Sequence, residues 1–156
     1  MNRSVVFLLF SAIVLISSCS KNNLDQPGFP GLRCAVGNAE YIADSANYKR
    51  NGLLGTAIYA YTGANQKFQF FLVRTTSNQL ADSIGVYQLD STYNKAYYYS
   101  GGTTYRSISG SLTISQYFND SLGTIVGSFN FVGREPGSSG NTVNIATGYF
   151  NNIPRR

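Results

Sequence analysis

The chain is predicted to form an all-β fold, an antiparallel β-sandwich of about nine or ten strands. Three observations predict it. Beyond residue 31, segments in which apolar and polar residues alternate recur about every 8–12 residues. Clusters of Gly, Asn, Asp and Ser separate these segments, and no segment keeps an apolar helical period over several turns. A lipocalin-like β-barrel is the alternative, because closed barrels produce the same pattern.

The first expected element is a hairpin over residues 32–43. Leu32, Cys34 and Val36 alternate with less apolar neighbours, as one buried face of a strand requires. The Gly-Asn pair that follows suits a tight turn, since both residue types tolerate positive φ. After the hairpin, the polar segment 44–52 is predicted to be a loop.

Two longer strands are expected over residues 53–62 and 66–76. Phe68 and Phe70 lie on one face of the second strand, and Phe71 lies on the other. Because both faces are partly apolar, the pair is expected to lie centrally in its sheet or to have its second face covered. The same two-sided pattern motivates the carrier alternative, in which a barrel encloses a small apolar ligand.

The remaining strands follow at short intervals. A strand over residues 85–89 leads to a tyrosine-rich hairpin over 95–107, which turns at its Gly-Gly pair. Separate strands are then expected through Leu112 and Ile114 and over residues 125–131. After a loop rich in Gly and Ser comes the last strand, over residues 143–150, where the alternation breaks near its glycine and predicts a β-bulge at Gly148.

The N-terminus is predicted to be an export signal, residues 1–18, that ends at a lipid-attachment site. Arg3 supplies a positive start, and an apolar run of about a dozen residues follows, too short for a helix spanning roughly 30 Å. The run ends in Ile-Ser-Ser before Cys19, which resembles the bacterial lipobox. We therefore expect Cys19 to carry the lipid, residues 19–31 to form a flexible tether and residues 32–153 to form one domain.

These features predict a lipoprotein of the outer membrane. A Ser follows Cys19, which suits transfer to that membrane by analogy with known sorting, and no acid-rich tract resembling a surface-export signal comes after it. The periplasmic face is the expected location, with surface exposure as the alternative. If Cys19 is acylated, Cys34 has no second thiol in the chain for a disulfide and is expected to be a small buried hydrophobe.

Five segments together resemble a family of small Bacteroidota lipoprotein domains of unknown function. The segments are residues 32–43, 85–89 (GVYQL), 110–115 (GSLTIS), 127–131 (GSFNF) and 143–150 (VNIATGYF). The last four are similar to the family patterns Gly-Thr-Tyr-x-Leu, Gly-x-Leu-Thr-Ile-Thr, Gly-Thr-Phe-x-Phe and Val-x-Ile-Thr-x-Gly-x-Phe. In the first, the usual Asn-Gly turn is reversed and a Tyr replaces a Trp. The resemblance implies an all-β domain behind a lipid anchor, with no catalytic residues to transfer.

The composition argues against an enzyme, a cofactor and a nucleic-acid partner. The chain contains no His, which excludes Ser-His-Asp and Cys-His nucleophile arrangements and His-based zinc sites. Neither nucleotide-binding pattern, GxxxxGKS or GxGxxG, occurs, and the seven acidic residues are dispersed. The formal net charge of +5 comes from scattered Lys and Arg rather than from a basic cluster. An enzyme using Asp, Glu or Tyr alone would need two carboxylates converging in one cleft.

The tyrosines are the candidate binding residues. Tyr97, Tyr98, Tyr99 and Tyr105 crowd one hairpin, and alternation places Tyr98 on the opposite face from its two neighbours. One interpretation is a platform for a glycan, a peptide or an envelope protein, since Tyr combines apolar area with a polar tip. The other interpretation is β propensity with ordinary core packing. The predicted function is therefore a binding, accessory or structural module, with the carrier as the alternative.

No metal site is predicted. Side-chain oxygens that suit calcium occur in loops, but the spacing D-x-D-x-D-G is missing. Turn formation by Asp and Asn explains the same residues. They are Asp82, Asp90, Asn94, Asn119 and Asp120.

Overall fold

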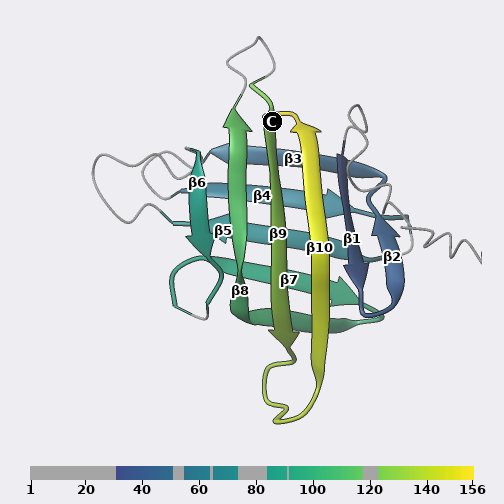
Figure 1. The fold of residues 1–156 in the computed structure, drawn as a ribbon. Helices are drawn as coiled ribbons and strands as arrows, with labels where there is room; N and C mark the ends of the chain where they lie inside the picture. Colours follow the sequence, from purple (N-terminus) through teal and green to yellow (C-terminus); the bar gives the residue numbers. More distant parts are fainter. Residues whose placement is uncertain (1–30, 51–54, 64, 74–83, 91, 118–122) are drawn as a thin grey trace, which may run out of the picture.

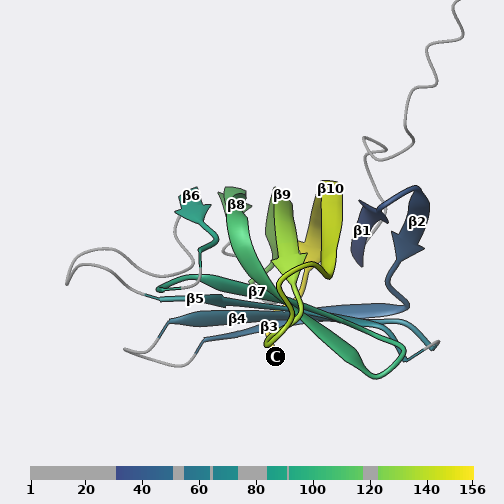
Figure 2. The same cartoon turned by 90° about the horizontal axis from the view of Figure 1, so that it is seen from below.

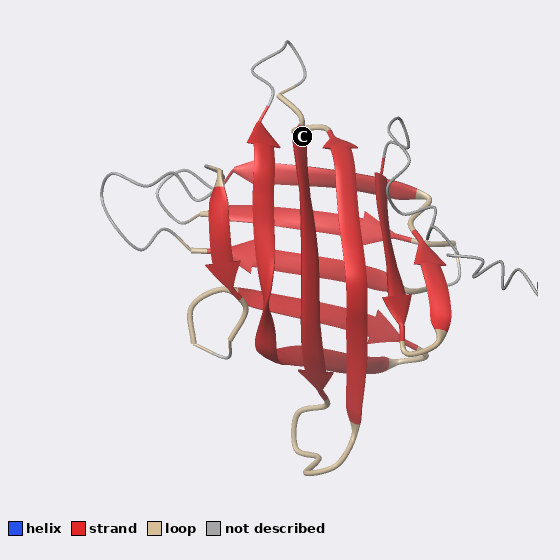
Figure 3. Cartoon of the chain, in the orientation of Figure 1, coloured by secondary structure: helices blue, strands red, loops and turns tan. Residues whose placement is uncertain are grey.

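The computed structural model describes residues 31–50, 55–63, 65–73, 84–90, 92–117 and 123–156. All regular elements in this part of the chain are β-strands, and their pairings are antiparallel. The strands are β1 (Gly31–Val36), β2 (Ala39–Ile42), β3 (Ser45–Arg50), β4 (Thr56–Tyr61), β5 (Lys67–Leu72), β6 (Gly85–Gln88), β7 (Lys95–Ser100), β8 (Thr103–Tyr117), β9 (Ile125–Arg134) and β10 (Thr142–Ile153). The predicted all-β, antiparallel class is confirmed (Figure 3).

The strands form one sheet that folds over on itself. Their order is β2-β1-β10-β9-β8-β7-β5-β4-β3, with β6 paired to β8 beside this path. The front layer consists of β6, the second part of β8, β9, β10, β1 and β2, and the rear layer consists of the first part of β8, β7, β5, β4 and β3 (Figure 1). The strands of the two layers cross each other, and Figure 2 shows the layers stacked. This is a curled, half-barrel form of the sandwich with crossed layers.

Strand β8 makes the corner between the layers. Its first residues pair with β7, while its second part pairs with β6 and β9. The register shifts between Ser107 and Ser109, and such a bulge bends a strand without ending it. The buried Ser107 hydroxyl supports the bend, because it accepts the Ala96 N–H at 3.0 Å and donates to the Asp90 carbonyl at 3.3 Å. The prediction of two separate strands here was wrong, since one continuous strand serves both layers.

The segment predicted as a polar loop contains β3, so that prediction was wrong as well. Tyr48 is completely buried and fixes the strand to the core. Its backbone pairs with the C-terminal segment, since the Tyr48 N–H donates to the Pro154 carbonyl and the Arg156 N–H donates to the Tyr48 carbonyl. Edge strands tolerate polar residues on their exposed side, and for that reason the pattern of residues 44–52 resembled a loop.

Other local predictions are confirmed. The β1–β2 hairpin turns at Gly37, and the β7–β8 hairpin turns at Gly101 and Gly102, all with positive φ. In β10 the register shifts between Ile145 and Gly148, where the bulge was expected. Strands β4 and β5 lie centrally in the rear layer, between β3 and β7.

Aromatic side chains fill the interior between the layers. Phe68 and Phe70 of the rear layer meet Phe129 and Phe131 of the front layer, with ring centroids 4.8 to 6.1 Å apart. Aliphatic residues from both layers complete one continuous cluster around these rings. A packed interior of this kind is the core of a sandwich, and it gives no support to the carrier interpretation.

The buried pair Cys34 and Tyr41 predicts sensitivity to alkali. Burial raises the pKa of the Cys34 thiol far above its usual range. The pKa of Tyr41 is raised as well, mainly by burial and to a smaller extent by the neighbouring Cys34. In the unfolded chain the thiol ionises near pH 9, so stability is complete below that pH and falls as pH rises. Above pH 9 we expect the free energy of unfolding to fall more steeply with pH in the wild type than in Cys34→Ala. The two slopes should differ by about 1.4 kcal/mol per pH unit.

Denaturant titrations from pH 7 to 11 measure this difference. Tyr41 is present in both proteins, so the effect of its burial is common to both, and only the part of its ionisation that depends on Cys34 enters the difference. Equal slopes for the two proteins would show that the Cys34 thiol is no better shielded from water when folded than when unfolded.

Candidate binding surface

The four candidate tyrosines lie on opposite sides of the rear layer. Tyr98 is 4% exposed and stacks on Phe68, with ring centroids 4.8 Å apart. Tyr105 stacks on Tyr98 and packs against the core. Tyr97 and Tyr99 alternate with Tyr98 along β7 and lie half-buried on the outer side. Core packing therefore accounts for the buried Tyr98 and for the partly buried Tyr105, while Tyr97 and Tyr99 remain as candidates on the outer side.

Strand pairing aligns these two tyrosines with further side chains on the same side of the sheet, of which Ala57 is buried and the others are partly or well exposed. The register forms three rows across the rear layer, each with one residue from β4, one from β5 and one from β7. The rows are Tyr59, Gln69 and Tyr97; Tyr61, Lys67 and Tyr99; and Ala57, Phe71 and Lys95. On β3, Asn47 lies opposite Tyr59 and Lys49 lies opposite Ala57. We call these eleven residues the aromatic face.

Ring contacts connect the aromatic face from β4 to β7. Tyr59 meets Phe71 edge to face at 6.3 Å between centroids, and Phe71 meets Tyr97 in the same way at 5.8 Å. Tyr97 and Tyr99 lie nearly parallel, with an interplanar angle of 24°. Among the described residues, no strand covers this side of the rear layer (Figure 2). The rings therefore hold one another in place while part of their surface meets solvent.

The charge of the aromatic face is positive. The Lys67 ammonium lies 4.0 Å from the centroid of the Tyr99 ring, within the range of a cation–π interaction. Lys49 and Lys95 add two further charges, and strands β3, β4, β5 and β7 contain no Asp or Glu. Asp44 lies at the rim, where its carboxylate accepts the Gly63 N–H.

Hydrogen-bonding groups are interspersed with the rings. The Tyr99 hydroxyl donates to the Gln69 side-chain carbonyl at 3.0 Å. Burial, and then the neighbouring Tyr97, raise the pKa of Tyr99, so its hydroxyl stays a neutral donor well above physiological pH. The face thus offers rings, ammonium groups, amides and phenols together.

The outer side of the front layer has a different character. A shallow groove of about 220 Å³ runs across β8, β9 and β10 there. Small polar residues dominate its lining, which consists of Ser111, Thr113, Ser128, Phe129, Asn130, Thr147, Gly148 and Tyr149. The concentration of aromatic and basic residues is thus a property of the rear layer and not of both outer faces.

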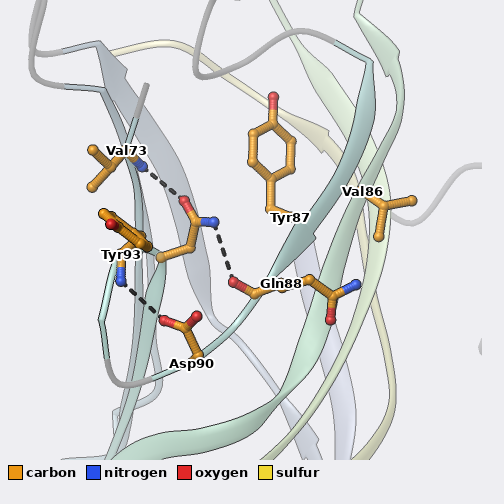
Figure 4. Close-up of a pocket in the computed structure, with 7 residues that line it drawn as sticks. Val73, Val86, Tyr87, Gln88, Asp90 and Tyr93 are labelled. Carbon is orange, nitrogen blue, oxygen red and sulfur yellow. Dashed lines mark hydrogen bonds between the residues drawn. The ribbon is translucent and has the colours of Figure 1, made fainter. Parts of the chain in front are cut away.

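A second hollow, of about 240 Å³, lies beside β6 and is drawn in Figure 4. One of its polar side chains, Asn94, connects the residue that follows β5 to strand β6: it accepts the Val73 N–H at 2.9 Å and donates to the Gln88 carbonyl at 3.1 Å. The Asp90 carboxylate accepts the backbone N–H of Tyr93 at 2.9 Å and that of Thr92 at 2.7 Å. These two bonds, Tyr93 first, lower the pKa of Asp90. The polar groups of this hollow hold a turn together, which is a structural role.

The same contacts bear on the calcium candidates. Asp90 and Asn94 are engaged in the turn, while Asp82, Asn119 and Asp120 lie outside the described residues. In the part of the chain that the structure describes, no three Cys, Asp or Glu side chains gather closely enough to hold a metal ion.

Sequence reasoning missed Tyr59, Tyr61 and Phe71 as members of a surface. The available signal was the two-sided apolar pattern of the strands that carry them. That pattern leaves open whether the second face is covered or exposed. The outward position of these residues follows only once β4, β5 and β7 are known to be neighbours.

Comparison with known proteins identifies the family. The family described as "Domain of unknown function (DUF6252)" matches residues 29–154. Neither a search of curated proteins nor a search of solved structures finds a match. Within the described residues, no helix is long and apolar enough to cross a membrane. Since the match includes every strand of the sandwich, the chain belongs to the DUF6252 family of domains of unknown function.

Proposed function

We propose that this protein is an outer-membrane lipoprotein, anchored through Cys19 at the periplasmic face, whose β domain is a non-enzymatic binding module. The aromatic face is the observation that carries the binding role. Four of its rings contact one another and are only partly buried, and the fifth ring, that of Tyr61, is 39% exposed. Contiguous exposed aromatic area of this kind favours a surface that meets a partner.

The anchor is tested by labelling the full chain with an alkyne analogue of palmitate in a Gram-negative host. We expect the wild type to incorporate the label and to sediment with membranes. Cys19→Ala should lose both properties, because it removes the thiol that accepts the diacylglycerol. Cys34→Ala is the matched control and should keep both, since the chain has only two Cys.

Two results would contradict the anchor. One is incorporation of the label by Cys19→Ala. The other is loss of the label from Cys34→Ala alone. Protease treatment of whole cells addresses orientation: at the periplasmic face the β domain should be cleaved only after the outer membrane is permeabilised, whereas cleavage in intact cells would place it at the surface.

The binding role is tested with the detergent-purified full chain on arrays of neutral glycans, acidic glycans and envelope lipids. We expect the wild type to bind at least one class and the double variant Tyr97→Ala/Tyr99→Ala to bind it more weakly. Undiminished binding by the double variant would remove the aromatic face from the proposal.

A further inference from the structure

We propose that the aromatic face binds a polysaccharide whose sugars carry carboxylate groups. The inference deepens the binding role proposed above and rests on it, since it names the class of ligand for that surface. It is drawn from the order of rings and cations across the rear layer.

Rings and cations stand side by side in the rows. Lys67 lies between Tyr61 and Tyr99, and Lys95 lies next to Phe71 on the neighbouring strand. Neighbouring strands of a sheet are about 4.8 Å apart, so an ammonium group and a ring reach the same small ligand unit. A uronic acid has this combination, because its ring offers a face of C–H groups and its edge carries a carboxylate. The ring can stack on a tyrosine while the carboxylate meets the adjacent lysine.

The charge of the face selects for an anion. Lys49, Lys67 and Lys95 lie on three different strands, and none of the four strands β3, β4, β5 and β7 has an acidic residue. Lys95 also attracts the Asp90 carboxylate in the turn before β7. A chain of carboxylates can meet the three lysines along its length, whereas a neutral ligand would leave Lys49 and Lys67 without an anionic partner from the ligand. Arg106, opposite Tyr97 in β8, extends the positive charge beyond β7.

The polar groups of the face favour a hydroxyl-rich ligand over a membrane. Gln69 lies between two tyrosines in its row, and Asn47 continues that row on β3. Amides and phenols in this position suit sugar hydroxyls, but they would lose hydrogen bonds to water in an apolar interior. The ring contacts also restrict side-chain motion before binding, which lowers the entropic cost of holding an extended chain.

The experiment measures binding of the full chain, in detergent, to polygalacturonate by isothermal titration calorimetry. The matched ligand control is the same polymer with its carboxyl groups reduced to alcohols. Dextran sulfate and phosphatidylglycerol vesicles serve as anions of other kinds. We expect polygalacturonate to bind with an affinity that falls as salt rises, and the reduced polymer to bind about tenfold more weakly.

Two double variants separate stacking from charge. Tyr97→Ala/Tyr99→Ala and Lys67→Gln/Lys95→Gln should each weaken binding of polygalacturonate about tenfold. The lysine variant keeps every ring, so it tests the face even if the tyrosine variant is unstable. Tyr149→Ala, which removes a partly buried ring from the groove on the outer side of the front layer, should bind like the wild type.

Several results would overturn the inference. They are equal binding of the reduced polymer, tighter binding of dextran sulfate or of the vesicles, and a loss in Tyr149→Ala as large as that in the two double variants. If the arrays described above detect a neutral glycan or a lipid at the same tyrosines, the inference fails while the binding role stands. The palmitate label is independent of all these measurements.

Discussion

Replacing Phe68 by Ala is expected to lower the free energy of unfolding by about 3–5 kcal/mol, at the upper end of the range for truncations in a core. Phe68 is completely buried, and its ring contacts rings from both layers. Tyr41 meets it edge to face at 4.7 Å between centroids, and Tyr98 stacks on it at 4.8 Å. Truncation removes these contacts and leaves a cavity that the two sheet layers cannot fully close.

The matched control is Phe71→Ala, three residues further along β5 on the outer side. The Phe71 ring is half-buried, and its ring contacts are with Tyr59 and Tyr97. We therefore expect its truncation to lower the free energy of unfolding by about 1 kcal/mol. Urea denaturation of the full chain, followed by circular dichroism, measures both variants. Similar losses for Phe68→Ala and Phe71→Ala would mean that β5 does not separate an inner face from an outer one.

Gly110→Ala is expected to be similarly damaging for a different reason. Gly110 lies in β8 just beyond the corner, with φ of 132°, a conformation that residues with a Cβ rarely adopt. A Cβ there would lie 2.3 Å from the Asn130 carbonyl oxygen and 2.5 Å from the Phe131 Cα, both in the backbone of β9. Backbone strain and the steric clash together should cost about 3–5 kcal/mol, because neither strand can move without breaking its pairing.

The control for this prediction is Gly140→Ala. A Cβ at Gly140 has no neighbour within 4 Å, and no positive φ is involved, so its melting temperature should stay within about 2 °C of the wild type. Differential scanning calorimetry of both variants provides the measurement. A melting temperature for Gly110→Ala equal to that of Gly140→Ala would show that β8 and β9 are not in close contact at this point.

Much of the fold could be predicted from alternation and turn residues. The two glycine-turn hairpins and the bulge at Gly148 are determined by nearby residues, and the structure contains them. The edge strand β3 could not be recognised, because one buried Tyr48 among polar residues is too weak a pattern. The continuity of β8 through its corner depends on pairing with three other strands, which no local pattern encodes.

The candidate surface was predictable only in part, for the same reason. Alternation alone separates Tyr97 and Tyr99 from Tyr98. Tyr97 and Tyr99 lie on the same surface as Tyr59 and Phe71 only because β5 pairs with β7, while β6 pairs with β8. This strand order is determined by long-range packing. Lys67 acquires its place beside Tyr99 through the same pairing.

The corner in β8 also bears on how the protein comes apart. Since one strand belongs to both layers, and the C-terminal segment joins the edge of the rear layer at Tyr48, neither layer is a closed unit that could detach and remain folded. Opening of one layer disrupts β8, whose pairing also holds the other layer together. We therefore expect the domain to unfold as a single cooperative unit, in which the aromatic face is lost together with the front layer.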